Sequence, residues 1–358
     1  MEFIEIDGSL GEGGGQIVRT SMSLSTIYGE PIRIKNIRSR RKQRGLRPQH
    51  LQSVLASARL CKGTLDGAFV GSTEIEFKPG RILNSFDEDI DTGTAGSICL
   101  IAQTIIPISI FGKVDLNLRI MGGTEVPNSP TVDYLVKVVL PVYQKLGAKI
   151  RMEVEQRGYY PRGGGILKLS CSGTDRNEPL VFDDVDKSAE SGKQAGIISC
   201  SRNLPSHVSQ RQLDVAKADL VAAGFSSLSS SLDNEGRSFS PGSSILVHSK
   251  SESILIGSSS LGERGKPAEK VGAEAVQNYL NEIAGCANVD SHLADMLMTL
   301  LGCVNGKSVF TTSFLSDHFA TNALVAKMIT RCSIDHRRAG SSSWMVEVTG
   351  LRGPIRKA

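Results

Sequence analysis

The sequence of 358 residues lacks the features of several specialised protein classes. Its seven cysteines are an odd, scattered set without a CxxC pair, which argues against a disulfide framework or a zinc site and predicts small buried side chains. No apolar run approaches the roughly 20 residues that span a bilayer. The start, MEFIEIDGSL, lacks the profile of a signal peptide. We therefore expect a cytoplasmic protein, or a nuclear one in a eukaryote, with no membrane partner.

Aromatic residues are also scarce, at 5% of the chain, so a stacking platform for nucleic-acid bases is not expected. Positive charge, in contrast, is concentrated. The net charge is only +4, yet the segment RSRRKQRGLR at 38–47 carries six basic residues and no acid. Such a block is either a solvated loop or a site for phosphate, because guanidinium groups pair with phosphate oxygens through two hydrogen bonds.

Common catalytic motifs are missing as well. GEGGGQIVRT at 11–20 lacks the spacing and the Lys-Ser/Thr pair of a P-loop, and GCVNGKS at 302–308 is followed by strand-like residues where a helix is needed. By itself GEGGG predicts a turn. There is no GxSxG or HExxH motif and no lysine of the kind that ligases adenylylate. Among six histidines, His318 lies where a strand meets an amphipathic helix, a position at which a helix N-terminus can help to bind an anion.

A motif of helix, strand, turn and strand is predicted three times, at 50–80, 132–170 and 318–350. Pro141 should kink or end the helix of the second motif. The repeats predict an α/β (α+β) fold in which helices cover one face of mixed sheets. Serine-rich residues 184–278 have apolar periodicity of their own and predict a small inserted α/β domain, which leaves 1–183 and 279–358 as the core.

Five segments together resemble the RNA 3′-terminal phosphate cyclase family: GEGGGQIVRT, RGYYPRGGGIL at 157–167, SSLGERGKPAEKVG at 259–272, HLAD at 292–295 and DHFATNA at 317–323. The resemblance covers essentially the whole chain. It implies repeated units similar to the C-terminal domain of translation initiation factor 3, with a thioredoxin-like insert. PRGGGIL would then be the second unit's counterpart of GEGGG.

The resemblance implies an ATP-dependent reaction in three steps. A histidine, here His318, attacks the α-phosphorus of ATP and releases pyrophosphate; AMP passes to the RNA 3′-phosphate; the 2′-hydroxyl then displaces AMP and closes a 2′,3′-cyclic phosphate. A neutral imidazole suits the first step. The implied partner is RNA with a 3′-terminal phosphate, and a homodimer is also allowed.

Site residues follow from the same resemblance. Glu12, Arg19, Arg38, Arg41 and Gln49 would contact the triphosphate and the RNA 3′-phosphate. ATP would also contact Gln103, Pro130, His292, Leu293, Ala294, Asp295 and Met296. Asp295 would help to hold Mg²⁺ or Mn²⁺, which prefer oxygen ligands.

The chain departs from the family at two positions, where His292 and Met296 replace a tyrosine and a glutamine that bacterial members tend to have. These changes bear on nucleotide selectivity and leave the nucleophile unchanged. Two alternatives remain: the family's non-catalytic branch, which acts in ribosomal RNA maturation, and an unrelated polyphosphate-binding protein. The presence of His318, Glu12 and the arginines favours the enzyme.

Overall fold

The computed structural model describes residues 2–173, 178–182, 194–340 and 342–351. Within them the first unit runs β1 (Ile4–Asp7), α1 (Gln16–Tyr28), β2 (Ile32–Lys35), α2 (Pro48–Leu60), β3 (Thr64–Asp66) and β4 (Ile75–Lys78). Its sheet has the order β1-β2-β4-β3, in which β1 and β2 are parallel and the other pairs antiparallel.

The second unit repeats this plan with β5 (Ser85–Asp91), α3 (Ile98–Gly112), β6 (Asp115–Gly122), α4 (Val132–Tyr134), α5 (Leu140–Lys145), β7 (Lys149–Gln156) and β8 (Gly165–Ser172). The order β5-β6-β8-β7 matches the first sheet. Between α4 and α5 the chain forms a π-helical turn, η1 (Leu135–Val139), just before Pro141. The predicted disturbance at the proline is therefore a widened turn, after which the helix continues to Lys145.

The third unit contains α8 (Ser291–Leu301), β13 (Gly306–Thr312), α9 (Asp317–Thr330), β14 (Ser333–Ala339) and β15 (Ser343–Gly350), with the sheet order β13-β15-β14. Two isolated parallel bridges to β13, from Val289 to Thr312 and from Val181 to Val309, stand where the other units have their leading strand. The three predicted motifs of helix, strand and strand are thus confirmed, and so is the mixed α/β class.

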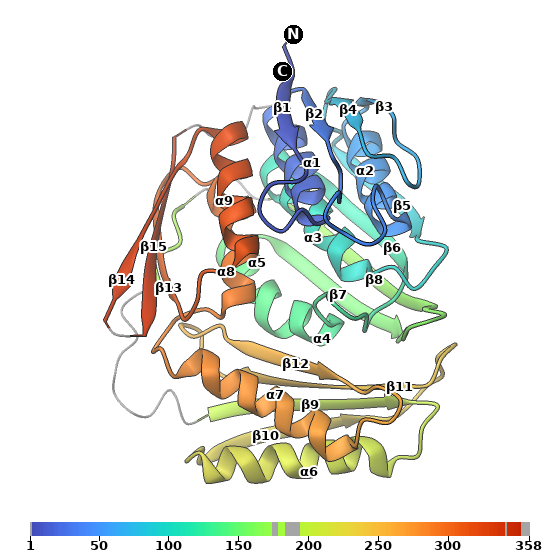
Figure 1. The fold of residues 1–358 in the computed structure, drawn as a ribbon, viewed down its shortest axis with the longest axis vertical. Helices are drawn as coiled ribbons and strands as arrows, with labels where there is room; N and C mark the ends of the chain where they lie inside the picture. Colours follow the sequence, from blue (N-terminus) through green and yellow to red (C-terminus); the bar gives the residue numbers. More distant parts are fainter. Residues whose placement is uncertain (1, 174–177, 183–193, 341, 352–358) are drawn as a thin grey trace.

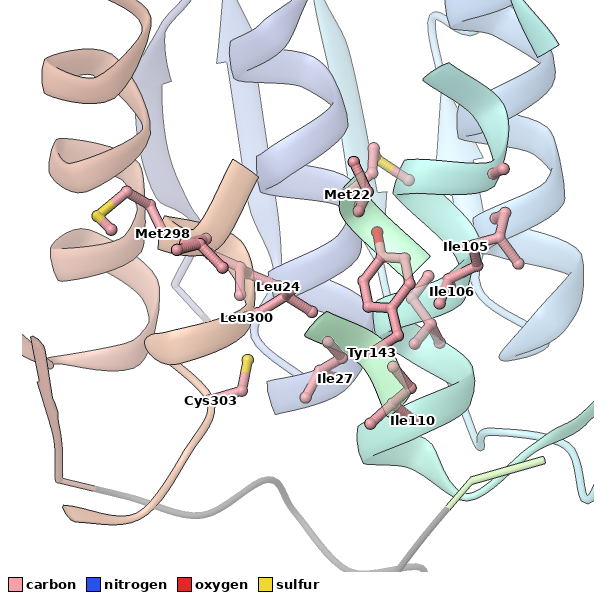
Figure 2. Close-up of a cluster of buried hydrophobic side chains, with 14 of the residues drawn as sticks. Met22, Leu24, Ile27, Ile105, Ile106, Ile110, Tyr143, Met298, Leu300 and Cys303 are labelled. Carbon is pink, nitrogen blue, oxygen red and sulfur yellow. The ribbon is translucent and has the colours of Figure 1, made fainter. Parts of the chain in front are cut away.

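The helices of the three units meet in one hydrophobic core. Helix α1 packs against α2, α3 and α9, and Figure 2 shows Leu24 and Ile27 of α1 beside Ile106 of α3, Tyr143 of α5 and Leu300 of α8. The loops at one end of these helices are thereby brought together. All described cysteines are free and buried except the exposed Cys286.

A second core belongs to the segment predicted as an insert. It contains β9 (Gln194–Arg202), α6 (His207–Ala222), β10 (Ser227–Asp233), β11 (Gly242–Ser249), β12 (Gly257–Leu261) and α7 (Ala268–Ile283), with the strand order β10-β9-β11-β12 (Figure 1). The predicted boundary at residue 278 falls inside α7, whose Tyr279 and Val276 belong to this core. The other predicted boundary, at 184, lies outside the described residues. The division of the chain into a core and an insert stays a prediction.

One predicted correspondence is wrong. GEGGG connects β1 to α1, whereas PRGGG forms the turn between β7 and β8. The counterpart of GEGGG in the second unit is the loop DTGTAGS at 91–97, which connects β5 to α3. The two glycine triplets therefore serve different turns.

Among the described helices none is long and apolar enough to cross a membrane.

Candidate active site

A cavity of about 920 Å³ opens where the loops of the three units meet the insert. The residues predicted from the sequence that line it are Glu12, Arg19, Arg38, Arg41, Gln49, Gln103, Pro130, His292, Asp295, Met296 and His318. Leu293 and Ala294 do not line it, because both are fully buried in the hydrophobic core. On helix α8 they follow His292 by one and two positions, which turns them away from the cavity.

His318 is the second residue of α9. Ser316 fixes the start of this helix, because its hydroxyl accepts a hydrogen bond from the Phe319 amide at 3.0 Å. Nε2 of His318 lies 3.1 Å from Oε2 of Glu12, and the His318 side chain is 40% exposed. Its Nδ1 is buried and has no hydrogen-bond partner in the described residues. Burial, and then Arg19, Arg41 and His292, lower the pKa of His318, although Glu12 acts in the opposite direction. The neutral imidazole is favoured, with Nε2 toward the cavity.

Glu12 connects the histidine to the basic loop. Its Oε2 also accepts a hydrogen bond from Nη2 of Arg41 at 2.5 Å. A Cβ at Gly14 would lie 2.1 Å from Oε1 of Glu12, and one at Gly15 would lie 2.0 Å from Nε2 of His50. The glycines therefore let two side chains lie directly on the backbone of the turn. GEGGG is a turn, as its sequence predicts, and it places a carboxylate beside His318.

Three arginines face the cavity. Arg19 donates to Oε1 of Gln16, and burial lowers the pKa of Arg19 to about 10. Arg38 donates to the carbonyl oxygens of Gln43 and Gly45 at 3.0 and 3.2 Å, which folds the basic loop. Burial, followed by repulsion from neighbouring arginines, lowers the pKa of Arg38. Within the described residues neither Arg19 nor Arg38 forms an ion pair with a carboxylate, so a polyanion would relieve their mutual repulsion.

The two predicted glutamines have different surroundings. Oε1 of Gln49 accepts a hydrogen bond from the Ser97 amide at 2.7 Å, and Ser97 caps α3. Nε2 of Gln103 lies 3.2 Å from the sulfur of Met296. Gln49 therefore holds the 91–97 loop against the basic segment, and Gln103 joins α3 to Met296 of α8, another residue that is predicted to contact ATP.

Asp295 lies in the cavity wall with its carboxylate largely buried. Its Oδ1 accepts from the Ser316 hydroxyl at 2.6 Å, and burial raises its pKa to about 8. The side chain of Asn322 donates to the backbone oxygen of Asp295 at 2.9 Å and accepts from Thr20 at 2.8 Å. Asn322 thus braces α1, α8 and α9 around the site.

Several lining residues were not predicted. The insert supplies Ser258 and Ser259 of β12 and Asn278, Asn281 and Glu282 of α7. Glu282 accepts hydrogen bonds from the amide and hydroxyl of Ser291, at 3.1 and 2.6 Å, and from Ser313. In sequence this polar face of α7 cannot be told from a solvated helix surface. His50 was also missed; it lines the cavity, and its Nδ1 accepts from the Arg47 amide at 3.1 Å.

Comparison with known proteins agrees with this arrangement. The family model described as RNA 3′-terminal phosphate cyclase matches residues 10–336. A protein of that name from Caldivirga maquilingensis is 41% identical over 340 residues, which cover 93% of this chain and 94% of the relative. One from Pyrococcus furiosus is 40% identical, with 91% and 92% covered, and one from Pyrobaculum neutrophilum is 38% identical, with 98% and 99% covered. The chain belongs to the RNA 3′-terminal phosphate cyclase family.

Proposed function

We propose that the protein uses ATP to convert an RNA 3′-terminal phosphate into a 2′,3′-cyclic phosphate, through a covalent bond between His318 and AMP. The observation that carries the proposal is the pairing of His318 Nε2 with Glu12 Oε2 at 3.1 Å, in a cavity lined by Arg19, Arg38 and Arg41. A nucleophile, a proton acceptor and positive charge for polyphosphate are thereby combined. The names of the similar proteins from three archaea support the same activity.

In the first step Nε2 of His318 attacks the α-phosphorus of ATP. A nitrogen–phosphorus bond forms, the bond from the α-phosphorus to the bridging oxygen breaks, and pyrophosphate leaves. Nε2 can attack only with its lone pair, so any proton on it must leave before the attack; Glu12 is in position to accept that proton, which leaves a neutral ring with its proton on Nδ1. Arg19, Arg38 and Arg41 would bind the charge that develops on the departing pyrophosphate.

In the second step an oxygen of the RNA 3′-phosphate attacks the phosphorus of the bound AMP and breaks its bond to His318. In the third step the vicinal 2′-hydroxyl attacks the RNA phosphorus, loses its proton, and displaces AMP. Both steps need mainly close positioning of the reacting groups, which contributes several kcal/mol. The size of the cavity, at the upper end of the usual range of about 300–1,000 Å³ for ligand sites, suits two substrates.

A divalent cation fits this site only in part. No group of three or more His, Cys, Asp or Glu side chains in the described ranges could hold a metal ion. Asp295 offers one carboxylate, of which Oδ1 accepts from Ser316. Mg²⁺ or Mn²⁺ bound there would take its other ligands from phosphates and water, and when bound would offset phosphate charge.

The direct test uses a short RNA with a 3′-terminal phosphate, ATP and Mg²⁺ or Mn²⁺. We expect a product whose terminal phosphate resists phosphatase and which forms together with AMP and pyrophosphate. The same RNA with a 3′-hydroxyl or only a 5′-phosphate should not react. If the terminal phosphate stays sensitive to phosphatase under all these conditions, the proposed function is wrong.

A further inference from the structure

Two exposed aromatic side chains and an arginine lie on the turn between β7 and β8 and on the loop between β10 and β11, although the chain as a whole is poor in aromatics. Tyr160 is 65% exposed and Phe239 is 56% exposed. The guanidinium carbon of Arg162 lies 5.6 Å from the centre of the Phe239 ring, and the Arg162 amide donates to Ser240 at 3.2 Å. Tyr160 and Arg162 belong to the turn between β7 and β8, whereas Phe239 comes from the insert. We call Tyr160, Arg162 and Phe239 the aromatic platform.

The glycines of PRGGG hold this arrangement together. A Cβ at Gly164 would lie 2.2 Å from a ring carbon of Phe239, so the ring lies directly against the backbone of the turn. A Cβ at Gly163 would lie 2.8 Å from Cα of Ala95, so the same turn also lies against the 91–97 loop. Both glycines have positive φ. The second glycine triplet thus permits close packing of three chain segments.

A short series of contacts connects the aromatic platform to the cavity. Gln49 lines the cavity and accepts a hydrogen bond from the Ser97 amide at 2.7 Å. A Cβ at Gly96 would lie 3.1 Å from Cβ of Gln49, and Ala95 lies against Gly163. The turn that carries Tyr160 and Arg162 is therefore joined through the 91–97 loop to Gln49, which lines the cavity.

A buried ion cluster anchors both halves of the platform. Arg157, at the base of the turn, donates to Glu125 at 2.6 Å, to Asp133 at 2.9 Å and to Asp233 at 2.8 Å. Asp233 ends β10 and begins the loop that carries Phe239, and it also pairs with Arg202 at 2.5 Å. Charges buried in this way hold neighbouring segments in one arrangement, because each would be costly without its partners.

The chemistry of the platform matches single-stranded RNA. The Arg162 guanidinium has no carboxylate partner within the described residues, so its charge is available to a phosphate. Proteins that bind single strands combine such cations with aromatic rings on which successive bases stack. Arg162 also covers part of the Phe239 ring, and this cation–π contact orients both side chains.

We propose that the aromatic platform binds the nucleotides that precede the 3′-terminal phosphate of the RNA. This inference rests on the proposed function, which brings the RNA end to Arg38, Arg41 and Gln49. From there the strand continues past the 91–97 loop, so that its bases stack on Phe239 and Tyr160 while Arg162 contacts a phosphate. The platform adds affinity that grows with RNA length and leaves the reaction with ATP unchanged.

The test measures binding of two 3′-phosphorylated RNAs by fluorescence anisotropy without ATP: an oligonucleotide of about eight residues, within the usual site sizes, and a dinucleotide too short to reach the platform. Phe239→Ala should weaken binding of the longer RNA about tenfold, the typical effect of losing one stacked base. Its affinity for the dinucleotide should not change, and Phe239→Tyr should restore the longer RNA. Arg162→Ala should reduce the slope of log affinity against log salt by about 0.7.

Phe69→Ala is the matched control, since Phe69 is also exposed, at 62%, in the loop between β3 and β4. It should bind both RNAs as the unaltered protein does. Equal losses for Phe69→Ala and Phe239→Ala, or equal losses for both RNAs, would overturn the platform. Uptake of label from ATP is measured separately: its absence contradicts the histidine–AMP step, while the dependence of binding on RNA length still decides the platform.

Discussion

Nε2 of His318 lies 3.1 Å from Oε2 of Glu12, although the two residues stand at opposite ends of the chain. The β1–α1 turn supplies the carboxylate, and the start of α9 supplies the imidazole. The same carboxylate also binds Arg41, which limits its freedom to turn away. Glu12 is therefore placed to orient the ring and to accept its proton.

Replacement of Glu12 by glutamine should slow the transfer of AMP to the protein by about 100-fold, the lower end of the range for loss of a general base. Glutamine keeps the size of the side chain but cannot accept the proton as a carboxylate does. Transient uptake of labelled AMP measures the rate. Glu5→Gln is the control, because Glu5 pairs with Lys35 on the protein surface; this variant should take up AMP at the normal rate. A normal rate for Glu12→Gln would show that the proton leaves by another route.

The pH dependence of AMP uptake should follow the lowered pKa of His318. Above that pKa the imidazole is neutral and can attack; below it the ring is protonated and cannot. The rate should therefore stay constant as the pH falls from 8 to the usual histidine range near 6.5, and decline only at lower pH. A half-maximal rate at a pH above 6.5 would mean that Glu12 outweighs burial and raises the pKa.

Asp295 should make the free protein less stable at higher pH. Burial raises its pKa to about 8 in the folded protein, compared with about 3.9 in unfolded chains. The folded state thus binds more protons between these values, and the free energy of unfolding falls as pH rises until about pH 8. Asp295→Asn, which still accepts the hydrogen bond from Ser316, should raise the melting temperature more at pH 8 than at pH 5. Equal shifts at the two pH values would contradict the raised pKa.

Removal of Arg157 should be among the most destabilising changes on the surface between core and insert. Arg157→Met leaves the buried carboxylate of Glu125 without its cation, which typically costs about 3–5 kcal/mol. Calorimetry should show a lower melting temperature. Arg151→Met serves as the control, since the Arg151 side chain is 82% exposed and should have little effect. Similar melting temperatures for the two variants would show that the cluster contributes nothing net.

The sequence predicts the three helix–strand–strand motifs because the spacing of apolar residues indicates which face of each element is buried. It does not predict the two isolated bridges at Val289 and Val181, which stand in place of a leading strand in the third unit. It misassigns the second glycine triplet, since glycine marks close backbone packing without showing what packs there. The resemblance supplies 11 of the 28 residues that line the cavity, and it also includes Leu293 and Ala294, which helical geometry turns into the core. The cavity residues that come from the insert reach the site only through tertiary packing, so the sequence does not predict them.

The central claim is that His318 becomes covalently linked to AMP. The protein is incubated with ATP labelled at the α-phosphate and with Mg²⁺ or Mn²⁺, denatured, and digested, and the labelled peptide is identified by mass spectrometry. We predict an acid-labile, alkali-stable label on the peptide that contains His318, and none on His318→Ala. Wild-type protein that takes up no label, or a His318→Ala variant that takes up label normally, would contradict a covalent bond between His318 and AMP.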